Sequence, residues 1–247
     1  MTEAIYNKLA KYYLFISMIG LYGRDGHLIE ARALKRMINK HKKSKGNEML
    51  IVASGLGLHE KFLKKDYKIT GIDSNNGMLM ISRKINPDIR YRKADMRAFR
   101  LAKKFDIVMC LDAMAHLQTY GNFEVALRNF SRHLKNGGVL IFSLDPVKGW
   151  FREFEIKTYS KGKKEVTLIH INHLRRKNDV KFDSCIVFVV KEKGKKMKIY
   201  LDESPMGLFE VGKIKRILSK MGFRFVVYES FTGRKYGKEN PVFICWK

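Results

Sequence analysis

The sequence predicts a doubly wound α/β fold, in which helices cover both faces of a mostly parallel sheet of seven strands. Short apolar stretches typical of buried strands alternate with segments of helical spacing between residues 49 and 144. Gly55 and Gly57 directly follow the first of these strands, where the chain must turn tightly into a helix. The length fits one unit, because 247 residues of which 45% are hydrophobic can bury one sizeable core.

The first part of the chain is expected to be helical. Residues 4–19 and 27–38 carry apolar residues at helical spacing, and the turn-forming run from Tyr22 to Gly26 separates them. We therefore expect a helical cap over residues 1–45 and a main domain over residues 46–247.

No segment is expected to cross a membrane. The apolar run at residues 12–22 is too short for a bilayer, and no small-residue cleavage site follows it. Cys110, Cys185 and Cys245 form no C-x-x-C pair and lie in apolar, strand-like runs, which predicts buried structural thiols. These observations favour a cytoplasmic protein.

The main domain begins with alternating elements and then changes character. Strands are expected at residues 49–53, 67–72, 89–92, 105–111 and 139–144, and helices at residues 58–64, 75–84 and 122–134. Successive strands at residues 165–173, 181–190 and 196–201 then predict an antiparallel insert at about residues 160–205. A helix at residues 211–221 and strands at residues 223–230 and 241–246 complete the chain. The insert would extend the face at which such sheets bind ligands.

The formal charge of +26 is spread along the sequence rather than gathered in a tail. One interpretation is attraction to an anion, such as RNA, a nucleotide-linked substrate or a membrane surface. The other is a solvated, lysine-rich surface without a specific partner. Composition alone leaves both open.

Polar residues follow three consecutive strands. Asp73 comes sixteen residues after Gly57, at the end of the second strand, where a carboxylate can accept hydrogen bonds from both hydroxyls of a ribose. The alternative role of Asp73 is an N-cap of the next helix. Asp95 follows the third strand and could accept from an adenine amino group, with Met96 packed on the ring. This order favours a cofactor made of a nucleoside and an amino acid over a dinucleotide.

Five segments, residues 49–57, 69–73, 94–96, 105–109 and 134–140, resemble the successive motifs of class I S-adenosylmethionine-dependent methyltransferases. The resemblance covers nearly the whole chain and implies a Rossmann-like fold with S-adenosylmethionine as methyl donor and S-adenosylhomocysteine as product. Residues 95–97, 115–117 and 206–209, with the late insert, are more loosely similar to N,N-dimethyltransferases of nucleotide-linked amino sugars.

The resemblance also implies roles for individual residues. The residues that would face the methionine part of the cofactor are Ala53, Ser54, Gly55 and Gly57. Asp73 would hold the ribose, Asp95 and Met96 the adenine, and the cofactor site would also include Ser74, Met78 and Leu111.

Two positions of the first motif depart from the family pattern. The acidic residue usually found in the first strand is Ile51, and the first glycine is Ala53. Ala53 fits if its φ is negative, but Ile51 cannot replace a carboxylate. Either another residue holds the methionine ammonium or cofactor affinity is reduced, so a non-catalytic binding protein is an alternative.

Candidates for the acceptor site follow the fourth strand and lie on the first helix. Transfer from a sulfonium requires alignment of the acceptor lone pair and, for amines, removal of a proton. His116 suits this task near neutral pH, and its position matches a histidine of some amino-sugar enzymes; an ordinary surface histidine is the alternative. By the same resemblance Tyr12 and Tyr13 would close over the active site, although aromatic pairs often only pack. Asp112 could bind a cationic amine or cap a helix.

The sequence narrows the chemistry further. After the fourth strand there is no N-P-P-Y or D-P-P-Y motif, the pattern that resembles enzymes methylating the amino groups of bases or of glutamine. Cys110 is not in a Pro-Cys or Thr-Cys setting, so covalent attack on a pyrimidine is not expected either. His170 and His173 could line a pocket of the insert, and no metal site is predicted. We expect N- or O-methylation of a small molecule, anionic or nucleotide-linked. RNA modification is the alternative that the charge supports.

Overall fold

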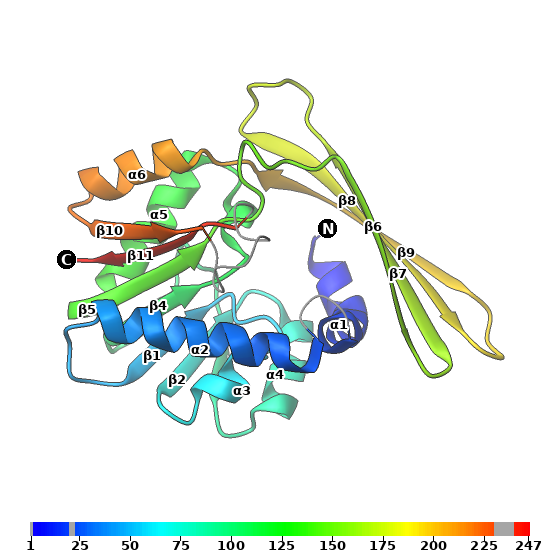
Figure 1. Ribbon diagram of the computed structural model, residues 1–247, viewed down its shortest axis with the longest axis horizontal. Coiled ribbons are helices and arrows are strands. Elements are labelled where there is room, and N and C mark those ends of the chain that lie inside the picture. The colour runs from blue at the N-terminus through cyan, green and yellow to red at the C-terminus, as the bar shows by residue number, and fades with distance from the viewer. Residues whose placement is uncertain (1, 20–22, 230–239) are drawn as a thin grey trace.

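The computed structural model describes residues 2–19, 23–229 and 240–247. Its centre is a seven-stranded sheet with the order β10-β11-β5-β4-β1-β2-β3 (Figure 1). The strands are β1 (Glu48–Val52), β2 (Lys68–Asp73), β3 (Arg90–Lys93), β4 (Phe105–Cys110), β5 (Leu134–Ser143), β10 (Arg224–Tyr228) and β11 (Val242–Trp246). β1 to β5 pair in parallel, and β11 runs antiparallel to both β5 and β10. The predicted doubly wound, mostly parallel fold is confirmed.

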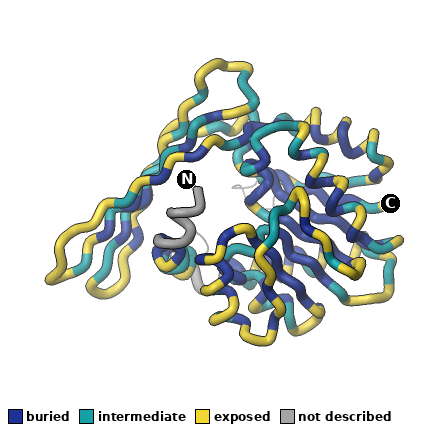
Figure 2. Tube along the Cα trace, turned by 180° about the vertical axis from the view of Figure 1, so that it is seen from behind, coloured by how far each residue is buried: buried dark blue, intermediate teal, exposed yellow. Residues whose placement is uncertain are grey.

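Helices cover both faces of this sheet because its strands are apolar on both sides. In β1, Leu50 and Val52 belong to the core beneath α5 (Tyr120–Arg132) and α6 (Val211–Lys220). Met49 and Ile51 belong to the opposite core, beneath α2 (Gly23–His41), α3 (Glu60–Leu63) and α4 (Asn76–Ile85). This alternation is what a strand buried on both faces requires. Figure 2 shows the buried residues concentrated in this layered part of the molecule.

A second sheet, β6-β7-β8-β9, is antiparallel throughout. It consists of β6 (Phe154–Lys161), β7 (Lys164–His173), β8 (Lys181–Glu192) and β9 (Lys198–Gly207). The antiparallel insert is therefore confirmed, but the sequence interpretation missed β6 and ended the last strand too early. In β6 the alternation of apolar and polar residues breaks, because Phe154 and Ile156 lie on one face and are exposed, whereas Tyr159 lies on the other face and is buried.

Helix α1 (Thr2–Ile19) lies between the two sheets (Figure 1). Leu9, Tyr12 and Ile16 pack against the inner face of the antiparallel sheet, where they meet Val166 and Phe188. The opposite side of the helix contacts α4. One helix thus joins the second sheet to the layered domain.

The beginning of the second helix differs from the expectation. A turn was expected up to Gly26, but α2 already begins at Gly23, and Tyr22 lies outside the described residues. Glycine weakens a helix by about 1 kcal/mol relative to alanine. Leu34 and Ile38 of α2 are fully buried on the sheet, and tertiary packing of this kind outweighs a weak local preference.

The remaining expectations concern membranes and thiols. Among the described residues, no helix is both long and apolar enough to span a bilayer. The three cysteines are free thiols; Cys110 and Cys245 are buried as expected, whereas Cys185 is only half-buried.

Candidate functional site

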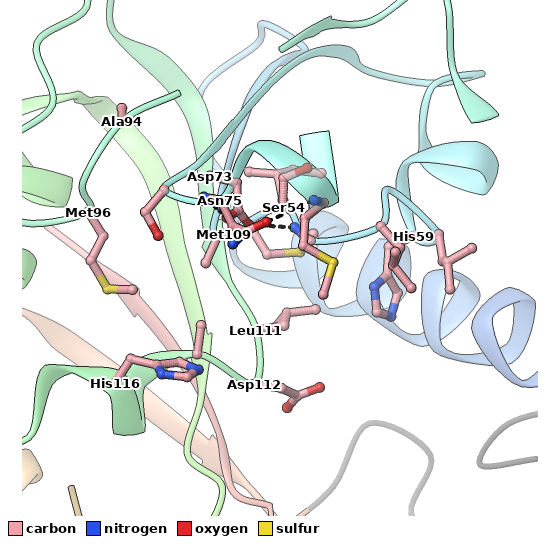
Figure 3. Close-up of a pocket in the computed structure, with 18 of the residues that line it drawn as sticks. Ser54, His59, Asp73, Asn75, Ala94, Met96, Met109, Leu111, Asp112 and His116 are labelled. Carbon is pink, nitrogen blue, oxygen red and sulfur yellow. Dashed lines mark hydrogen bonds between the residues drawn. The ribbon is translucent and has the colours of Figure 1, made fainter. Parts of the chain in front are cut away.

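A cavity of about 720 Å³ lies at the carboxyl ends of the central parallel strands (Figure 3). This is the edge at which doubly wound sheets bind ligands, because the loops that leave neighbouring strands converge there. Most of the predicted site residues line it: Tyr13, Ala53, Ser54, Gly55, Asp73, Ser74, Met78, Asp95, Met96, Leu111 and His116. Two predicted residues, Tyr12 and Gly57, are not in the lining.

The turn after β1 is built from left-handed backbone. The φ of Gly55 is +57° and that of Gly57 is +73°, in the region that favours glycine. Ala53 also has a positive φ, +53°, so the condition of a negative φ is not met at this position. A left-handed alanine costs roughly 1–2 kcal/mol, and the surrounding structure must offset this strain.

The two glycines have different surroundings. A Cβ on Gly55 would meet no heavy atom within 4 Å, and this residue lines the cavity. A Cβ on Gly57 would lie 2.9 Å from both Asn86 Nδ2 and the Tyr91 hydroxyl, and the Gly57 carbonyl accepts a hydrogen bond of 2.8 Å from that same amide. Gly57 therefore holds the turn against α4 and β3, whereas Gly55 leaves room for a ligand.

We expect the variants Gly57→Ala and Gly55→Ala to differ in stability. Both introduce a left-handed alanine, so each should lose roughly 1–2 kcal/mol. Gly57→Ala must also displace Asn86 or Tyr91, and overpacking of this kind adds about 1–3 kcal/mol. Urea denaturation measures the free energy of unfolding of each variant. Equal losses for the two variants would contradict the structural role given to Gly57.

Asp73 ties the loop after β2 to the turn after β1. It is 8% exposed; its Oδ2 accepts a hydrogen bond of 2.8 Å from the Gly55 amide, and its Oδ1 accepts one of 2.8 Å from the Asn75 amide. Burial raises the pKa of Asp73, and these backbone donors oppose the rise. The N-cap of α4 is Asn75, whose side chain accepts from the Met78 amide, so the alternative role of Asp73 as the cap is wrong.

Asp95 is not a free acceptor. Arg97 forms a bidentate ion pair with Asp95, with Nε 3.0 Å from Oδ1 and Nη2 2.6 Å from Oδ2. This guanidinium lowers the pKa of Asp95, which therefore stays ionised at neutral pH. Met96 lies next to it in the lining, and its side chain is drawn in Figure 3. The predicted adenine contact at Asp95 would have to share the carboxylate with Arg97.

Asp112 and His116 belong to the segment that follows β4. Asp112 has a φ of +50°, and its Oδ1 accepts a hydrogen bond of 2.7 Å from Ser143 Oγ on β5. Burial raises the pKa of Asp112. His116 lies in the 3₁₀ helix η1 (Met114–Leu117), and burial lowers its pKa, so that its imidazole is neutral at pH 7. A carboxyl and a neutral imidazole thus share this wall of the cavity.

The two adjacent tyrosines of α1 separate. Tyr13 lines the cavity, and its ring lies 5.1 Å from that of Phe188. The Tyr12 ring instead packs against Tyr200 of β9 at 5.5 Å, and burial is the largest cause that raises the pKa of Tyr12 to about 12. Neighbouring residues of a helix point about 100° apart, so Tyr13 can face the cavity while Tyr12 faces the antiparallel sheet. His170 and His173 do not line the cavity either.

Sequence reasoning missed several residues of the lining, among them His27, His59 and Glu60. Glu60 is 1% exposed and accepts a hydrogen bond of 2.6 Å from Ser54 Oγ. Burial raises the pKa of Glu60. Ile51, which stands where the first motif usually has an acidic residue, also lines the cavity but has no carboxylate. Glu60 provides a carboxylate beside the turn that follows β1. The signal was present in the sequence, because His59 and Glu60 follow Gly57 closely.

Comparison with known proteins agrees with this geometry. Residues 49–138 match the model of a methyltransferase domain. The chain is 32% identical over 133 residues to the dTDP-3-amino-3,6-dideoxy-alpha-D-glucopyranose N,N-dimethyltransferase of Streptomyces fradiae, a match that covers 53% of this chain and 50% of the relative. It is 28% identical over 189 residues to the dTDP-3-amino-3,4,6-trideoxy-alpha-D-glucopyranose N,N-dimethyltransferase of Streptomyces venezuelae, which covers 72% of this chain and 76% of that one. The match thus spans only half the length of the first relative.

The fold is shared with solved structures over nearly the whole chain. DesVI of Streptomyces venezuelae superposes with a TM-score of 0.81 at 22% identity, and the match covers 96% of each chain. At this identity the similarity shows the fold alone. It extends through α1 and the antiparallel sheet.

Proposed function

We propose that the chain is a class I S-adenosylmethionine-dependent methyltransferase and that it transfers a methyl group from this donor to the amino group of a nucleotide-linked amino sugar. The observation that supports the proposal is a single cavity that has residues suited to the methyl donor on one side and residues suited to an amine acceptor on the other. In Figure 3, Asp73 and Ser54 lie on one side of the cavity, and Asp112 and His116 lie on the other. Tyr13 also lines the cavity. A donor and an acceptor can therefore meet in one cavity.

The residues around the turn fit the donor. Gly55 leaves open space beside the backbone, and the carboxylate of Asp73 faces that turn with acceptor capacity left for hydroxyl groups. Glu60 supplies a carboxylate for the methionine ammonium, which Ile51 cannot bind. When bound, S-adenosylmethionine supplies an electrophilic methyl group on a sulfonium.

The chain's own residues would align the acceptor and move a proton. The acceptor nitrogen forms the new bond to carbon with its lone pair while the carbon–sulfur bond breaks, so the nitrogen must lose one proton. His116 is neutral at pH 7 and can take that proton. Asp112, in the same lining, can hold an amine in place while it is still cationic. The Tyr13 hydroxyl offers a further hydrogen bond to the acceptor.

The named relatives favour an amine acceptor and a sugar nucleotide. Both act on dTDP-linked amino sugars, as their names state. The charge of +26 suits a diphosphate as well as it suits RNA, so it no longer favours the RNA alternative. We also infer that, of the predicted cap over residues 1–45, α1 closes over the active site, since Tyr13 reaches the cavity. The second helix, α2, packs on the central sheet and belongs with residues 46–247 to the catalytic domain.

The proposal is tested in two steps. Titration calorimetry should detect binding of one S-adenosylmethionine per chain. Incubation with a dTDP-linked amino sugar should then give a product heavier by one or two methyl groups in mass spectrometry. The same sugar nucleotide with a hydroxyl in place of the amine is the matched control and should stay unmodified. Absence of donor binding would refute the proposal, and methylation of the control would change the acceptor class to a hydroxyl.

A further inference from the structure

Three side chains that the proposed methyl transfer does not use converge beside the same cavity. The Oε2 atom of Glu30 lies 2.8 Å from His59 Nε2 and 3.6 Å from His27 Nδ1. One ligand atom from each of the three residues lies within 4.8 Å of those of the other two. The two imidazole rings meet edge to face, with their centroids 5.2 Å apart.

Two packed helical segments hold this cluster in place. His27 and Glu30 are three residues apart on α2, so they lie on the same face of the helix. His59 directly precedes α3, which packs against α2. His27 is 8% exposed and Glu30 is 6% exposed, so neither side chain can turn freely into water. The three side chains are thus already close together without a ligand.

We propose that His27, Glu30 and His59 bind a divalent transition metal of the Zn²⁺ class. Two imidazoles and one carboxylate are a donor set that zinc accepts at bond lengths of about 2.0–2.2 Å. In a tetrahedral site such bonds place neighbouring ligand atoms roughly 3.3–3.5 Å apart. The distance from Glu30 to His27 is close to this value, and the distance from Glu30 to His59 must widen by about half an ångström.

The fourth position of such a site would face the cavity. His27 and His59 both line it, and Asp112 belongs to the same lining. Three protein ligands with one open position are the arrangement of zinc sites that bind an exchangeable ligand. The chemistry that would occupy this position is an oxygen donor, either water or an oxygen of a bound small molecule.

The competing possibility is a metal-free ion cluster. Glu30 would then hold both imidazoles by hydrogen bonds alone, and the chain would bind no metal at this place. The sequence does not indicate a site, because the interval from Glu30 to His59 matches no metal-binding motif.

Metal content separates the two possibilities without any methyl donor. The full chain is freed of metal with a chelator, dialysed, and titrated with Co²⁺ and Zn²⁺ in separate experiments. Mass spectrometry of the metal should find one ion per chain. Bound Co²⁺ should give the visible absorption of a four-coordinate ion with mixed nitrogen and oxygen ligands.

Variants locate the site. His27→Ala, Glu30→Gln and His59→Ala should each weaken metal binding by at least about 100-fold, because each removes one of three protein ligands. His41→Ala is the matched control, since His41 ends the same helix and bonds Tyr228 instead, and it should bind metal like the native chain. Circular dichroism shows whether each variant is folded. If an alanine variant fails to fold, Glu30→Gln still tests the site, because it keeps the size of the side chain. The proposal is overturned if the native chain binds no stoichiometric metal, or if binding survives all three substitutions. Because no donor is present, failure of this site leaves the proposed methyl transfer untouched.

Discussion

Replacement of Asp73 by alanine is expected to lower the affinity for S-adenosylmethionine by roughly 100- to 10,000-fold. Hydrogen bonds to a charged group contribute about 1.5–3 kcal/mol each, and two ribose hydroxyls would lose their acceptor. The substitution also removes the acceptor of the Gly55 and Asn75 amides, both at 2.8 Å, so the turn that faces the donor loses its support. Titration calorimetry measures the affinity directly.

Asp73→Asn is the control for this experiment. It keeps the size of the side chain and one acceptor oxygen but loses the charge and the second acceptor. We expect an intermediate affinity and a melting temperature closer to that of the native chain than Asp73→Ala shows. If Asp73→Ala binds the donor like the native chain, the ribose role of Asp73 is wrong.

Replacement of His116 by alanine is expected to lower kcat by about 100- to 10,000-fold, the range that a general base contributes. The donor affinity should change only slightly, because the predicted role of His116 lies with the acceptor. Steady-state kinetics with the amino sugar, together with calorimetry of the donor, separates the two effects. An unchanged kcat would leave proton removal to solvent.

The pH dependence follows from the direction of the pKa shift. Burial lowers the pKa of His116 below its usual 6.5, so the imidazole stays neutral through pH 7. On this account kcat falls only when the pH drops below that lowered pKa, and the acidic limb of the profile lies below pH 6.5. His116→Ala should lose this limb. A limb that persists in the variant would belong to another group, such as the acceptor amine.

The order of the central elements could be predicted because the inner strands β1, β2 and β4 are buried on both faces. Met49 to Val52 and Ile107 to Cys110 are continuous apolar runs, which indicate buried strands directly. β6 could not be recognised in this way, since Phe154 and Ile156 remain exposed. The start of α2 was missed because two glycines favour a turn locally, and only packing on the sheet decides otherwise.

The part of the site that could be predicted consists of residues that directly follow the strands of the parallel sheet. Asp73 and Met96 could be placed from their position after a strand, since parallel strands end at one edge of the sheet. Tyr12 could not be told from Tyr13, because the orientation of a helix about its axis depends on the packing of its neighbours. His27 and Glu30 come from a helix distant in sequence from His59, and no spacing in the chain connects them.

The position of α1 between the two sheets has a consequence for variants far from any ligand. Tyr12 contacts the antiparallel sheet while its neighbour Tyr13 lines the cavity, so α1 connects the sheet with the cavity. Phe188, fully buried in β8, touches the Tyr13 ring. A smaller residue at Phe188 would leave that ring without its support and let it adopt other rotamers. If the proposed methyl transfer is correct, we expect the selectivity for the acceptor to depend on the packing of this antiparallel sheet, from which, among the described residues, only Pro205 lines the cavity.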